Sequence, residues 1–359
     1  MNKRAVTLYD VAREAGVSYQ TVSRVINHSA NVSNATRQRV FNAIKQLHYV
    51  PNKVAQQLAG KLSQTIGLAT TSLALHAPSQ IAAAVKARAS AERYHTVIAM
   101  VDNSHPQAVH DAVKQLQAQR VDGIIVNIPL SDTLASATRQ LGPQLPMLFN
   151  DVSPTCQENY VIFDPSLGSH LTIERLVSLG HREIVLLTGP QDSISAALRA
   201  DSACKQLRTH QLAPVLTVAG DWSAKSGFDA MTYAMLQKKR FTAVVVANDQ
   251  MALGALRALT EAGFSVPEEV SVTGYDDTSD SAFFSPPLTT IRQNFSLLGQ
   301  ESVEQLLTLI AGGSACQRVL PVSLIERETV AAVQASQPSA QQLARQLKKV
   351  ALQLEQLSQ

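Results

Sequence analysis

Apolar side chains recur at helical spacing in three short segments at the start of the chain. Thr7 and Asp10 can cap the first segment, and Gly16 can supply the left-handed turn that ends it. Ser18 and Ser33 are suited to cap the second and third segments. The predicted helices cover 8–15, 19–27 and 34–50. Their apolar positions are Leu8, Val11, Ala12, Ala15, Val22, Val25, Ile26, Val40, Ile44 and Leu47. Two short helices joined by a turn that contains glycine predict a helix-turn-helix.

From residue 65 onward, short apolar runs alternate with amphipathic stretches. The runs are TIGLAT (65–70), HTVIAMV (95–101), GIIVNI (123–128), PMLFND (146–151), YVIFD (160–164), EIVLLTG (183–189), AVVVAND (243–249) and SVTGYDD (271–277). Strand-like runs separated by helices predict parallel sheets of the α/β class, with enough strands for two lobes.

Several of these runs end in a polar side chain. The four positions are Asn127, Asp151, Asn248 and Asp276. Open α/β sheets bind ligands at the carboxyl ends of their strands, so the four side chains are expected to meet at one cleft. The chain has no phosphate-binding loop and no GxGxxG, which favours a neutral polyhydroxylated ligand over a nucleotide. Phe163, Trp222 and Phe295 could stack on a sugar, although core packing explains each aromatic equally well in isolation.

The C-terminal segment has a different apolar spacing. After a stretch rich in small residues, apolar side chains recur at spacings of four and three: Leu343, Leu347, Val350, Leu354 and Leu357. This spacing is typical of a coiled-coil seam, here only about two to three heptads long. It predicts either a helix that joins copies of the chain in a bundle or a single amphipathic helix that docks on the body.

Charge separates a positive head from a weakly negative remainder. Residues 1–61 hold nine Lys or Arg and two acidic residues, a net charge of +7. The rest of the chain holds 22 basic and 26 acidic residues, a net charge of −4. A compact positive head indicates a polyanionic partner, with a solvated basic face as the alternative.

Composition narrows the class of protein further. The 359 residues are 45% hydrophobic and 16% charged, which is ordinary for a globular chain of two or three domains. No run of about 18 apolar residues and no apolar signal core is present. Cys156, Cys204 and Cys316 lack a metal-like spacing, so we expect reduced thiols, a cytoplasmic location, and no metal or cofactor.

The second predicted helix carries side chains that can read DNA. Tyr19 and Gln20 lie on its first turn, and Arg24 follows one turn later. Arginine can pair with guanine and glutamine with adenine in the major groove, where such a helix docks. Short polar residues suited to phosphate contacts are Thr21, Ser23, Asn27 and Asn31. A helix-turn-helix look-alike inside an enzyme is the alternative.

Two N-terminal stretches carry a resemblance to a known family. VTLYDVAREAGVSYQTVSRVIN (6–27) resembles the DNA-binding head of the lactose/galactose repressor family, and YVPNKVAQQLAGK (49–61) resembles its hinge helix. The hinge has a small apolar face but is too short to be stable alone, and an ordinary linker would leave Leu58 exposed without a reason. The resemblance implies that Leu58 wedges into the minor groove. It also adds Asn52 and Gln56 to the DNA contacts.

The resemblance continues through the body, which is similar to a periplasmic-binding-protein type I fold. The matching segments are SLALHAPSQI, NIPL, NDVS, DSISAALR, GDWSAKSGF, VANDQMALGA, GYDDT and PPLTTIRQNFSLLGQ. They imply a sugar pocket lined by Leu75, Ala77, Pro78, Ile81, Asn127, Asp151, Phe163, Ser195, Arg199, Trp222, Asn248, Asp276, Gln293 and Phe295. Arg199, Asn248 and Asp276 would bond sugar hydroxyls, and the aromatic residues would form apolar walls.

Some positions depart from the family pattern. Asn150 stands where an apolar residue is expected, and Thr71 replaces a serine at the pocket floor. Both substitutions could shift ligand affinity or preference. Asn31 replaces a histidine in the head, which puts one DNA contact in doubt. The family also suggests that His76 pairs with Asp280 and responds to the ligand.

An enzymatic function finds no support in the motifs. The chain has no Ser-His-Asp order with a nucleophile elbow, no HExxH and no paired cysteines. GYDDTSD could suggest a metal site, but Asp276, Asp277 and Asp280 are better explained as one sugar ligand and two loop charges.

These patterns predict an N-terminal all-α helix-turn-helix head and an α/β two-lobed core of the periplasmic-binding-protein type I. A C-terminal α-helical oligomerisation tail completes the chain. The predicted boundaries are 1–49 for the head, 50–61 for the hinge helix, 62–330 for the core, 331–339 for a linker and 340–359 for a tetramerisation helix.

The implied function is a sugar-inducible transcriptional repressor of lactose-utilisation genes. It would bind a pseudo-palindromic operator in double-stranded DNA as a homodimer or homotetramer, and a β-galactoside inducer would release it. Two alternatives stay open: a regulator of the same family that answers to another ligand or to a co-repressor, and a simple sugar-binding protein.

Overall fold

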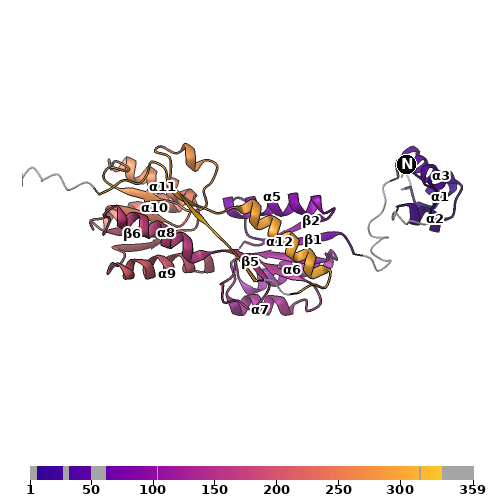
Figure 1. The fold of residues 1–359 in the computed structure, drawn as a ribbon, viewed down its shortest axis with the longest axis horizontal. Coiled ribbons are helices and arrows are strands. Elements are labelled where there is room, and N and C mark those ends of the chain that lie inside the picture. The colour runs from indigo at the N-terminus through magenta and orange to yellow at the C-terminus, as the bar shows by residue number, and fades with distance from the viewer. Residues whose placement is uncertain (1–5, 27–31, 50–61, 103, 315–316, 334–359) are drawn as a thin grey trace, which may run out of the picture. The chain divides into compact units, whose positions relative to one another are not determined.

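A computed structural model describes residues 6–26, 32–49, 62–102, 104–314 and 317–333 (Figure 1). Its contacts divide the chain into two units, Met1–Ser63 and Gln64–Gln359, and each is described by itself. The predicted hinge and tetramerisation helices lie outside the described residues. So do the following candidate site residues: Asn27, Asn31, Asn52, Gln56, Leu58, Leu343, Leu347, Val350, Leu354 and Leu357.

The head contains three helices, α1 (Leu8–Ala15), α2 (Tyr19–Ile26) and α3 (Asn34–Gln46). Thr7 and Asp10 form the predicted capping box, in which the Thr7 backbone N–H donates to the Asp10 carboxylate at 2.8 Å. Gly16 ends α1 at a φ of 62°, a left-handed conformation that glycine adopts without strain. Helix α3 ends at Gln46 rather than at the predicted residue 50, because His48 turns the backbone left-handed at a φ of 48°.

The early end of α3 lets one further side chain join the core of the head. Its buried members are Val11, Ala12, Ala15, Val22, Val25, Val40, Ala43 and Tyr49, with Leu8, Ile26, Ile44 and Leu47 packed at the edge. Helical spacing predicted most of these positions. Tyr49 was missed because it lies beyond the helix, where a backbone hydrogen bond from its N–H to the Ile44 carbonyl folds the chain back.

The first lobe of the core is built on a six-stranded parallel sheet. In the order β11-β5-β4-β3-β1-β2, its strands are Gln317–Leu320, Tyr160–Phe163, Met147–Phe149, Gly123–Asn127, Thr65–Thr70 and His95–Met100. Its helices are α5 (His76–Ala91), α6 (Pro106–Ala118), α7 (Asp132–Gln140) and α12 (Phe295–Ile310). Alternate side chains of β3 point to opposite faces: Ile124 packs with α6 and α7, whereas Ile125 packs with α5 and α12.

The second lobe repeats this plan on a smaller sheet. In the order β7-β6-β8-β9, its strands are Leu216–Ala219, Ile184–Thr188, Ala243–Val246 and Ser271–Thr273. Its helices are α8 (Pro165–Ser178), α9 (Ile194–Thr209), α10 (Ala224–Leu236) and α11 (Asp249–Glu261). Helices α10 and α11 pack on one face of the sheet, and α8 and α9 pack on the other.

Three crossings connect the two lobes. The chain passes from β5 to α8, from β10 (Thr290–Arg292) to α12, and from β11 to β12 (Ser323–Ile325). Strands β10 and β12 pair antiparallel, and Tyr275, Ile291 and Val322 form a small apolar cluster beside them. Residues at the carboxyl ends of strands from both sheets line the same cleft.

All eight predicted strand runs contain a strand. Strands β7, β10, β11 and β12 were not predicted, because they are three or four residues long and alternate or lack apolar positions. Among the described helices, none is long and apolar enough to cross a membrane.

Candidate functional site

The head exposes one polar face of α2. Tyr19, Gln20 and Arg24 are exposed, while Val22 and Val25 on the opposite face are fully buried in the head core. Thr21 and Ser23 are half-buried beside the exposed face. The first turn is held by the Ser18 hydroxyl, which accepts a hydrogen bond from the Thr21 backbone N–H at 3.2 Å. This arrangement leaves the three long side chains available to an external partner.

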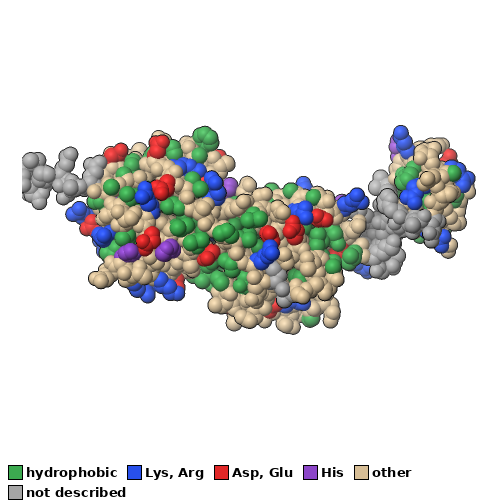
Figure 2. Space-filling view, in the orientation of Figure 1, with side chains coloured by type: hydrophobic (Ala, Val, Ile, Leu, Met, Phe, Trp, Pro, Cys, Tyr) green, Lys and Arg blue, Asp and Glu red, His purple; other side chains and the backbone are tan. Residues whose placement is uncertain are grey.

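Helix α1 contributes one side chain that the sequence reasoning missed. Tyr9 stacks on Tyr19 with ring centroids 4.8 Å apart, and 66% of Tyr9 remains exposed. Lys and Arg side chains also appear on the head in Figure 2. Arg13, Arg39 and Lys45 are exposed. To predict that Tyr9 joins this face, one must know how α1 crosses α2, and helical spacing alone does not give that crossing.

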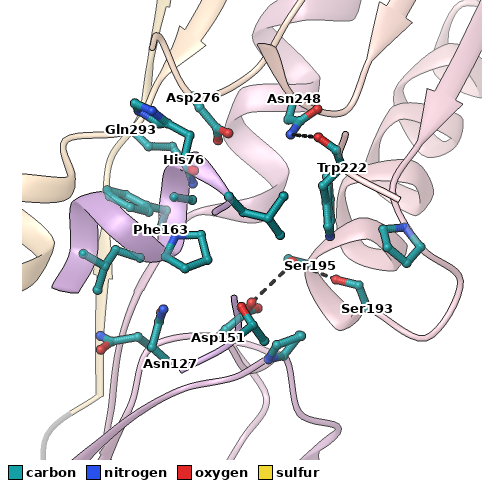
Figure 3. Close-up of a pocket in the computed structure, with 18 of the residues that line it drawn as sticks. His76, Asn127, Asp151, Phe163, Ser193, Ser195, Trp222, Asn248, Asp276 and Gln293 are labelled. Carbon is teal, nitrogen blue, oxygen red and sulfur yellow. Dashed lines mark hydrogen bonds between the residues drawn. The ribbon is translucent and has the colours of Figure 1, made fainter. Parts of the chain in front are cut away.

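The core holds a cavity of about 370 Å³ lined by residues of both lobes (Figure 3). All fourteen residues implied by the resemblance line it: Leu75, Ala77, Pro78, Ile81, Asn127, Asp151, Phe163, Ser195, Arg199, Trp222, Asn248, Asp276, Gln293 and Phe295. The four predicted strand-end residues lie at or just after the carboxyl ends of β3, β4, β8 and β9. The parallel topology therefore brings together side chains that are far apart in the sequence.

Arg199 and Asp276 form the charged part of the wall. The Arg199 guanidinium donates to the Ala247 carbonyl at 2.7 Å and to Gln293 Oε1 at 3.3 Å, and it lies 3.9 Å from Asp276 Oδ1. Its Cζ is 3.9 Å from the centre of the Tyr275 ring, a cation–π contact. The chain thus fixes Arg199 from several sides before any ligand arrives.

Asp276 is held in an unfavourable environment. It is 4% exposed, its φ is 117°, and its Oδ1 has no hydrogen-bond partner among the described residues. Burial raises the pKa of Asp276 to about 8, although Arg199 acts in the opposite direction. Unsatisfied buried oxygens and left-handed backbone at a non-glycine residue tend to mark functional positions, where a ligand can supply the missing partner.

Asp151 and Asn127 lie on the first lobe's side of the cavity. The Ser195 hydroxyl donates to Asp151 Oδ2 at 3.5 Å, which joins the two lobes across the cleft. Burial raises the pKa of Asp151 to about 6, against the lowering effects of Arg199 and Ser195. The Asn127 amide donates to Thr70 Oγ1 at 3.1 Å, and the Asn127 side chain lines the cavity.

Aromatic rings form two walls. The Phe163 and Phe295 rings meet edge to face, with centroids 5.8 Å apart. Trp222 has a φ of 75° and packs against Gly189, where an added Cβ would lie only 2.3 Å from the indole. The Asn248 amide donates to the Trp222 carbonyl at 3.0 Å (Figure 3). The rings therefore pack on each other and on the backbone while still facing the cavity.

His76 stands at the start of α5 between the lobes. Its backbone N–H donates to Gln250 Oε1 at 3.2 Å, a second contact between the lobes. Burial lowers the pKa of the imidazole, and the charge of Asp280 opposes this shift. Asp280 therefore acts on His76 electrostatically, while the predicted pairing of the two side chains and its response to the ligand stay predictions.

Two departures from the family pattern behave differently. Thr71 lines the cavity, as expected for a residue at the pocket floor. Asn150 also borders the cavity, but its amide donates away from it, to the Val161 carbonyl at 2.8 Å and to Ser302 Oγ at 2.7 Å. The structure thus gives Asn150 a role in tying α12 to the sheet.

Several lining residues were not predicted. They include Ser72, Asp102, Ser104, Asp192, Ser193, Asp221, Gln250 and Tyr275. Proximity in the sequence to predicted residues could have identified five of them: Asp192, Ser193, Asp221, Gln250 and Tyr275. Asp102 and Ser104 follow β2. They were missed because the predicted run 95–101 ends in the apolar Val101, so it offered no polar strand-end residue.

The second acidic residue of the 274–278 segment, Asp277, forms ion pairs within the protein. Asp277 bonds Arg292 and Arg327, each at 2.5 Å. Burial alone would raise the pKa of Asp277, but the bonds from the two arginines outweigh it and hold the pKa below its usual value. Among the described residues, no group of three His, Cys, Asp or Glu side chains is arranged to hold a metal. Cys156 and Cys204 are free thiols, and Cys316 lies outside the described residues.

Comparison with family models matches two parts of the chain. Residues 7–52 match the bacterial regulatory proteins of the lacI family, and residues 173–330 match a periplasmic binding protein-like domain. The first match covers the helix-turn-helix, and the second runs from within α8 through β12, which includes most of the second lobe together with α12 and β11 of the first.

Full-length relatives give the same result over nearly the whole chain. The lactose operon repressor of Escherichia coli (strain K12) is 50% identical over 99% of each chain. The lactose operon repressor of Klebsiella pneumoniae is 44% identical over 96% of this chain and 98% of its own. A crystal structure of the lac repressor dimer bound to operator and the anti-inducer ONPF is 51% identical, with a TM-score of 0.89 over 92% of this chain and 100% of that chain.

Proposed function

Because the chain belongs to the lacI family of bacterial regulatory proteins, we propose that it represses lactose-utilisation genes until a β-galactoside enters its cavity. It is a transcriptional repressor of the lac repressor type rather than an enzyme. Its partners are operator DNA, a second copy of the chain and the small ligand. Since a repressor must reach chromosomal DNA, we place it in the bacterial cytoplasm.

The observation that carries the ligand proposal is the make-up of the cavity. The half-buried Arg199 and the buried Asn248 and Asp276 supply donors and acceptors on one side, and aromatic rings supply flat apolar walls. A sugar needs both, because its hydroxyls must be hydrogen-bonded while its C–H faces need apolar contact. We assign hydroxyl binding to these three residues and stacking to Phe163, Trp222 and Phe295.

The exposed face of α2 carries the DNA proposal. In a helix-turn-helix, the start of the second helix enters the major groove. We assign base contacts to Tyr19, Gln20 and Arg24 and phosphate contacts to Thr21 and Ser23. The predicted contacts of Asn27, Asn31, Asn52, Gln56 and Leu58 belong to the same proposal and lie outside the described residues.

Coupling between the two functions follows from a cavity that both lobes share. A ligand held by Asp151 on one lobe and Ser195 on the other favours one arrangement of the lobes over another. The difference in its affinity for the two arrangements sets how far operator affinity changes. We propose that the induced arrangement is incompatible with two heads and hinge helices engaging both operator half-sites.

Fluorescence anisotropy on a labelled symmetric lactose operator tests this proposal. The protein should bind tightly alone and be released by a non-metabolised β-galactoside such as an isopropyl thiogalactoside. Tight binding that the galactoside leaves unchanged would reject the ligand class and keep the head assignment. Tighter binding with ligand would reveal a co-repressor mechanism instead.

The C-terminal seam adds a proposal on assembly. We propose that Leu343, Leu347, Val350, Leu354 and Leu357 join two dimers in a helical bundle; all five lie outside the described residues. Removal of residues 340–359 should convert a tetramer into a dimer in analytical ultracentrifugation without loss of galactoside binding. A full-length chain that sediments as a dimer would reject the tetramer.

A further inference from the structure

Helix α8 packs beside α9, the helix that carries Arg199, on one face of the second sheet (Figure 1). The structure describes α8 throughout, and of its residues only Pro165 lines the cavity. Gly168 and Ser169, one turn further along α8, contact instead the groups that hold Arg199 in place. These two residues can therefore influence a ligand only through their neighbours.

Ser169 ties the backbone of Arg199 to α8. Its buried hydroxyl donates to the Arg199 carbonyl at 2.9 Å. A second bond joins the same two helices, since the Ser202 hydroxyl donates to the Ser166 carbonyl at 3.2 Å. Breaking a hydrogen bond of a buried group leaves that group unsatisfied, which is costly. Helix α9 is therefore held close to α8 on both sides of Gly168.

Gly168 leaves the space that the ring of Tyr275 occupies. A Cβ added at Gly168 would lie 2.4 Å from the Tyr275 hydroxyl oxygen, 2.7 Å from Cε2 and 2.8 Å from Cζ. Carbon atoms in contact lie about 3.5–4.0 Å apart, so the ring would have to move. Tyr275 is buried and clusters with Ile291 and Val322, which restricts that movement. Glycine is less favourable than alanine inside a helix, and the close approach of the ring explains its presence here.

A displaced Tyr275 ring would displace Arg199 as well. The Arg199 Cζ is 3.9 Å from the ring centre, which is already contact distance. The guanidinium also donates to the Ala247 carbonyl at 2.7 Å and to Gln293 Oε1 at 3.3 Å. Hydrogen bonds weaken steeply as their geometry worsens, so a small shift of the ring changes where the guanidinium points. Because α9 is held to α8, the side chain has to absorb the shift.

Resting on the proposed β-galactoside function, we propose that Gly168 is a positioning residue for the sugar. It gives Tyr275 the space from which the ring holds Arg199 in line with the ligand hydroxyls. A larger residue at this position weakens galactoside binding and leaves operator binding unchanged. The effect passes through the ring of Tyr275, so it disappears when the ring is removed.

The first test is G168A in the full-length protein, with isopropyl thiogalactoside as the ligand. Trp222 is the only tryptophan and lines the cavity, so its fluorescence reports occupancy directly. We expect the dissociation constant to rise about tenfold, the change that corresponds to the usual cost of one methyl group forced into a packed interior. Operator affinity, measured by anisotropy without galactoside, should stay within about twofold.

A double-mutant cycle locates the effect at Tyr275. Y275L removes the three ring atoms that the new methyl group would meet. G168A/Y275L and Y275L should therefore bind the galactoside with the same affinity, within about twofold. Y275F removes only the closest atom, so G168A should cost about threefold in that background. The comparison of G168A/Y275L with Y275L decides the question even where G168A alone is too unstable to assay.

The ligand-free protein offers a spectroscopic readout of Arg199 itself. The Arg199 Cζ lies 5.8 Å from the centre of the Trp222 ring, so movement of the positive charge should shift the emission maximum of this indole in G168A. The control is G142A in the first lobe, whose added methyl group would meet Gln117 Nε2 at 2.6 Å. It should leave both the emission maximum and the galactoside affinity as they are in the unmodified protein.

Equal galactoside affinity in G168A and the unmodified protein would overturn the inference while leaving the β-galactoside function in place. A loss on adding G168A to Y275L as large as the loss on adding it to the unmodified protein would overturn the route through the ring. Absence of galactoside binding by the unmodified protein would overturn the proposed function, and this inference with it.

Discussion

The head and the ligand cavity place their proposed functional side chains in opposite environments. On α2, Tyr19 and Arg24 stand on the exposed face of one short helix, within a single stretch of sequence. In the cavity, Asn127, Asn248 and Asp276 are at most 6% exposed and come from strand ends that are distant in the sequence. The head meets its partner by adding contacts to a surface, whereas the cavity must surround its ligand.

This difference predicts how the two regions respond to mutation. Removing an exposed side chain of α2 costs only its contacts with DNA, since Val22 and Val25 hold the fold from the other face. Removing a buried polar group of the cavity leaves its partners without hydrogen bonds in a place that water reaches poorly. Cavity substitutions should therefore have the larger effects, and each region should change one function alone.

Asp276→Ala should have the largest effect. It removes the acceptor proposed for sugar hydroxyls and the carboxyl that lies 3.9 Å from the Arg199 guanidinium. We expect galactoside affinity to fall at least about 100-fold, the range found when a site loses a buried hydrogen-bonding group. Trp222 fluorescence measures it, and Asp229→Ala on the exposed face of α10 is the control. Operator affinity should stay within about twofold; loss of both functions would indicate misfolding instead.

Arg24→Ala should reduce operator binding by about 10- to 100-fold, the usual value of one bidentate base contact. Binding to random DNA should fall much less, because a single charge contributes little there. Lys45→Ala also removes one positive charge, at the end of α3, and should weaken binding to operator and to random DNA by the same factor. Anisotropy titrations on both DNAs measure the ratio, and an unchanged ratio in Arg24→Ala would remove this residue from the base contacts.

Tyr275→Leu should reduce galactoside affinity about fivefold by removing the ring against which Arg199 rests, a contact that aromatic and cationic groups favour by about 1 kcal/mol. Tyr275→Phe keeps the ring and should retain nearly full affinity, since the hydroxyl has no hydrogen-bond partner among the described residues. Equal losses in both variants would show that the hydroxyl matters and that the ring does not position Arg199.

Asp276→Asn should change the stability of the free protein in a pH-dependent way. Burial raises the pKa of Asp276 from 3.8 to about 8, so the folded state holds its proton at pH values where the unfolded state has lost it. This carboxyl therefore costs more stability as pH rises from about 4 to 8. The melting temperature of Asp276→Asn should exceed that of the unmodified protein by at least about 4 °C at pH 8, and the gap should vanish near pH 4. A gap that is constant with pH would contradict the raised pKa.

Sequence reasoning succeeded where local pattern determines structure. The Thr7–Asp10 capping box, the left-handed Gly16 and the eight apolar runs each depend on a few neighbouring residues, and each is present in the structure. The strand-end rule also placed Asn127 and Asp276 at the cleft, because parallel strands bring their carboxyl ends to one edge of a sheet. Roles for the individual site residues came from the family resemblance and remain proposals.

Features that depend on how distant segments pack were missed. Tyr9 meets Tyr19 only because α1 crosses α2 at a particular angle, and Tyr49 joins the core only because α3 ends early. The short strand β11 gains its place from pairing with β5 rather than from its own apolar pattern. Asp102 reaches the cavity because β2 lies beside β1, a neighbour relation that the sequence pattern does not specify.

The central claim is that one ligand cavity and one DNA-binding head are coupled through the arrangement of the two lobes. Trp222 fluorescence can measure galactoside affinity with and without saturating operator in the full-length protein. The account predicts weaker galactoside binding in the presence of operator, by the same factor by which saturating galactoside weakens operator binding, because coupling between two ligands is reciprocal. Equal galactoside affinity with and without operator would contradict it.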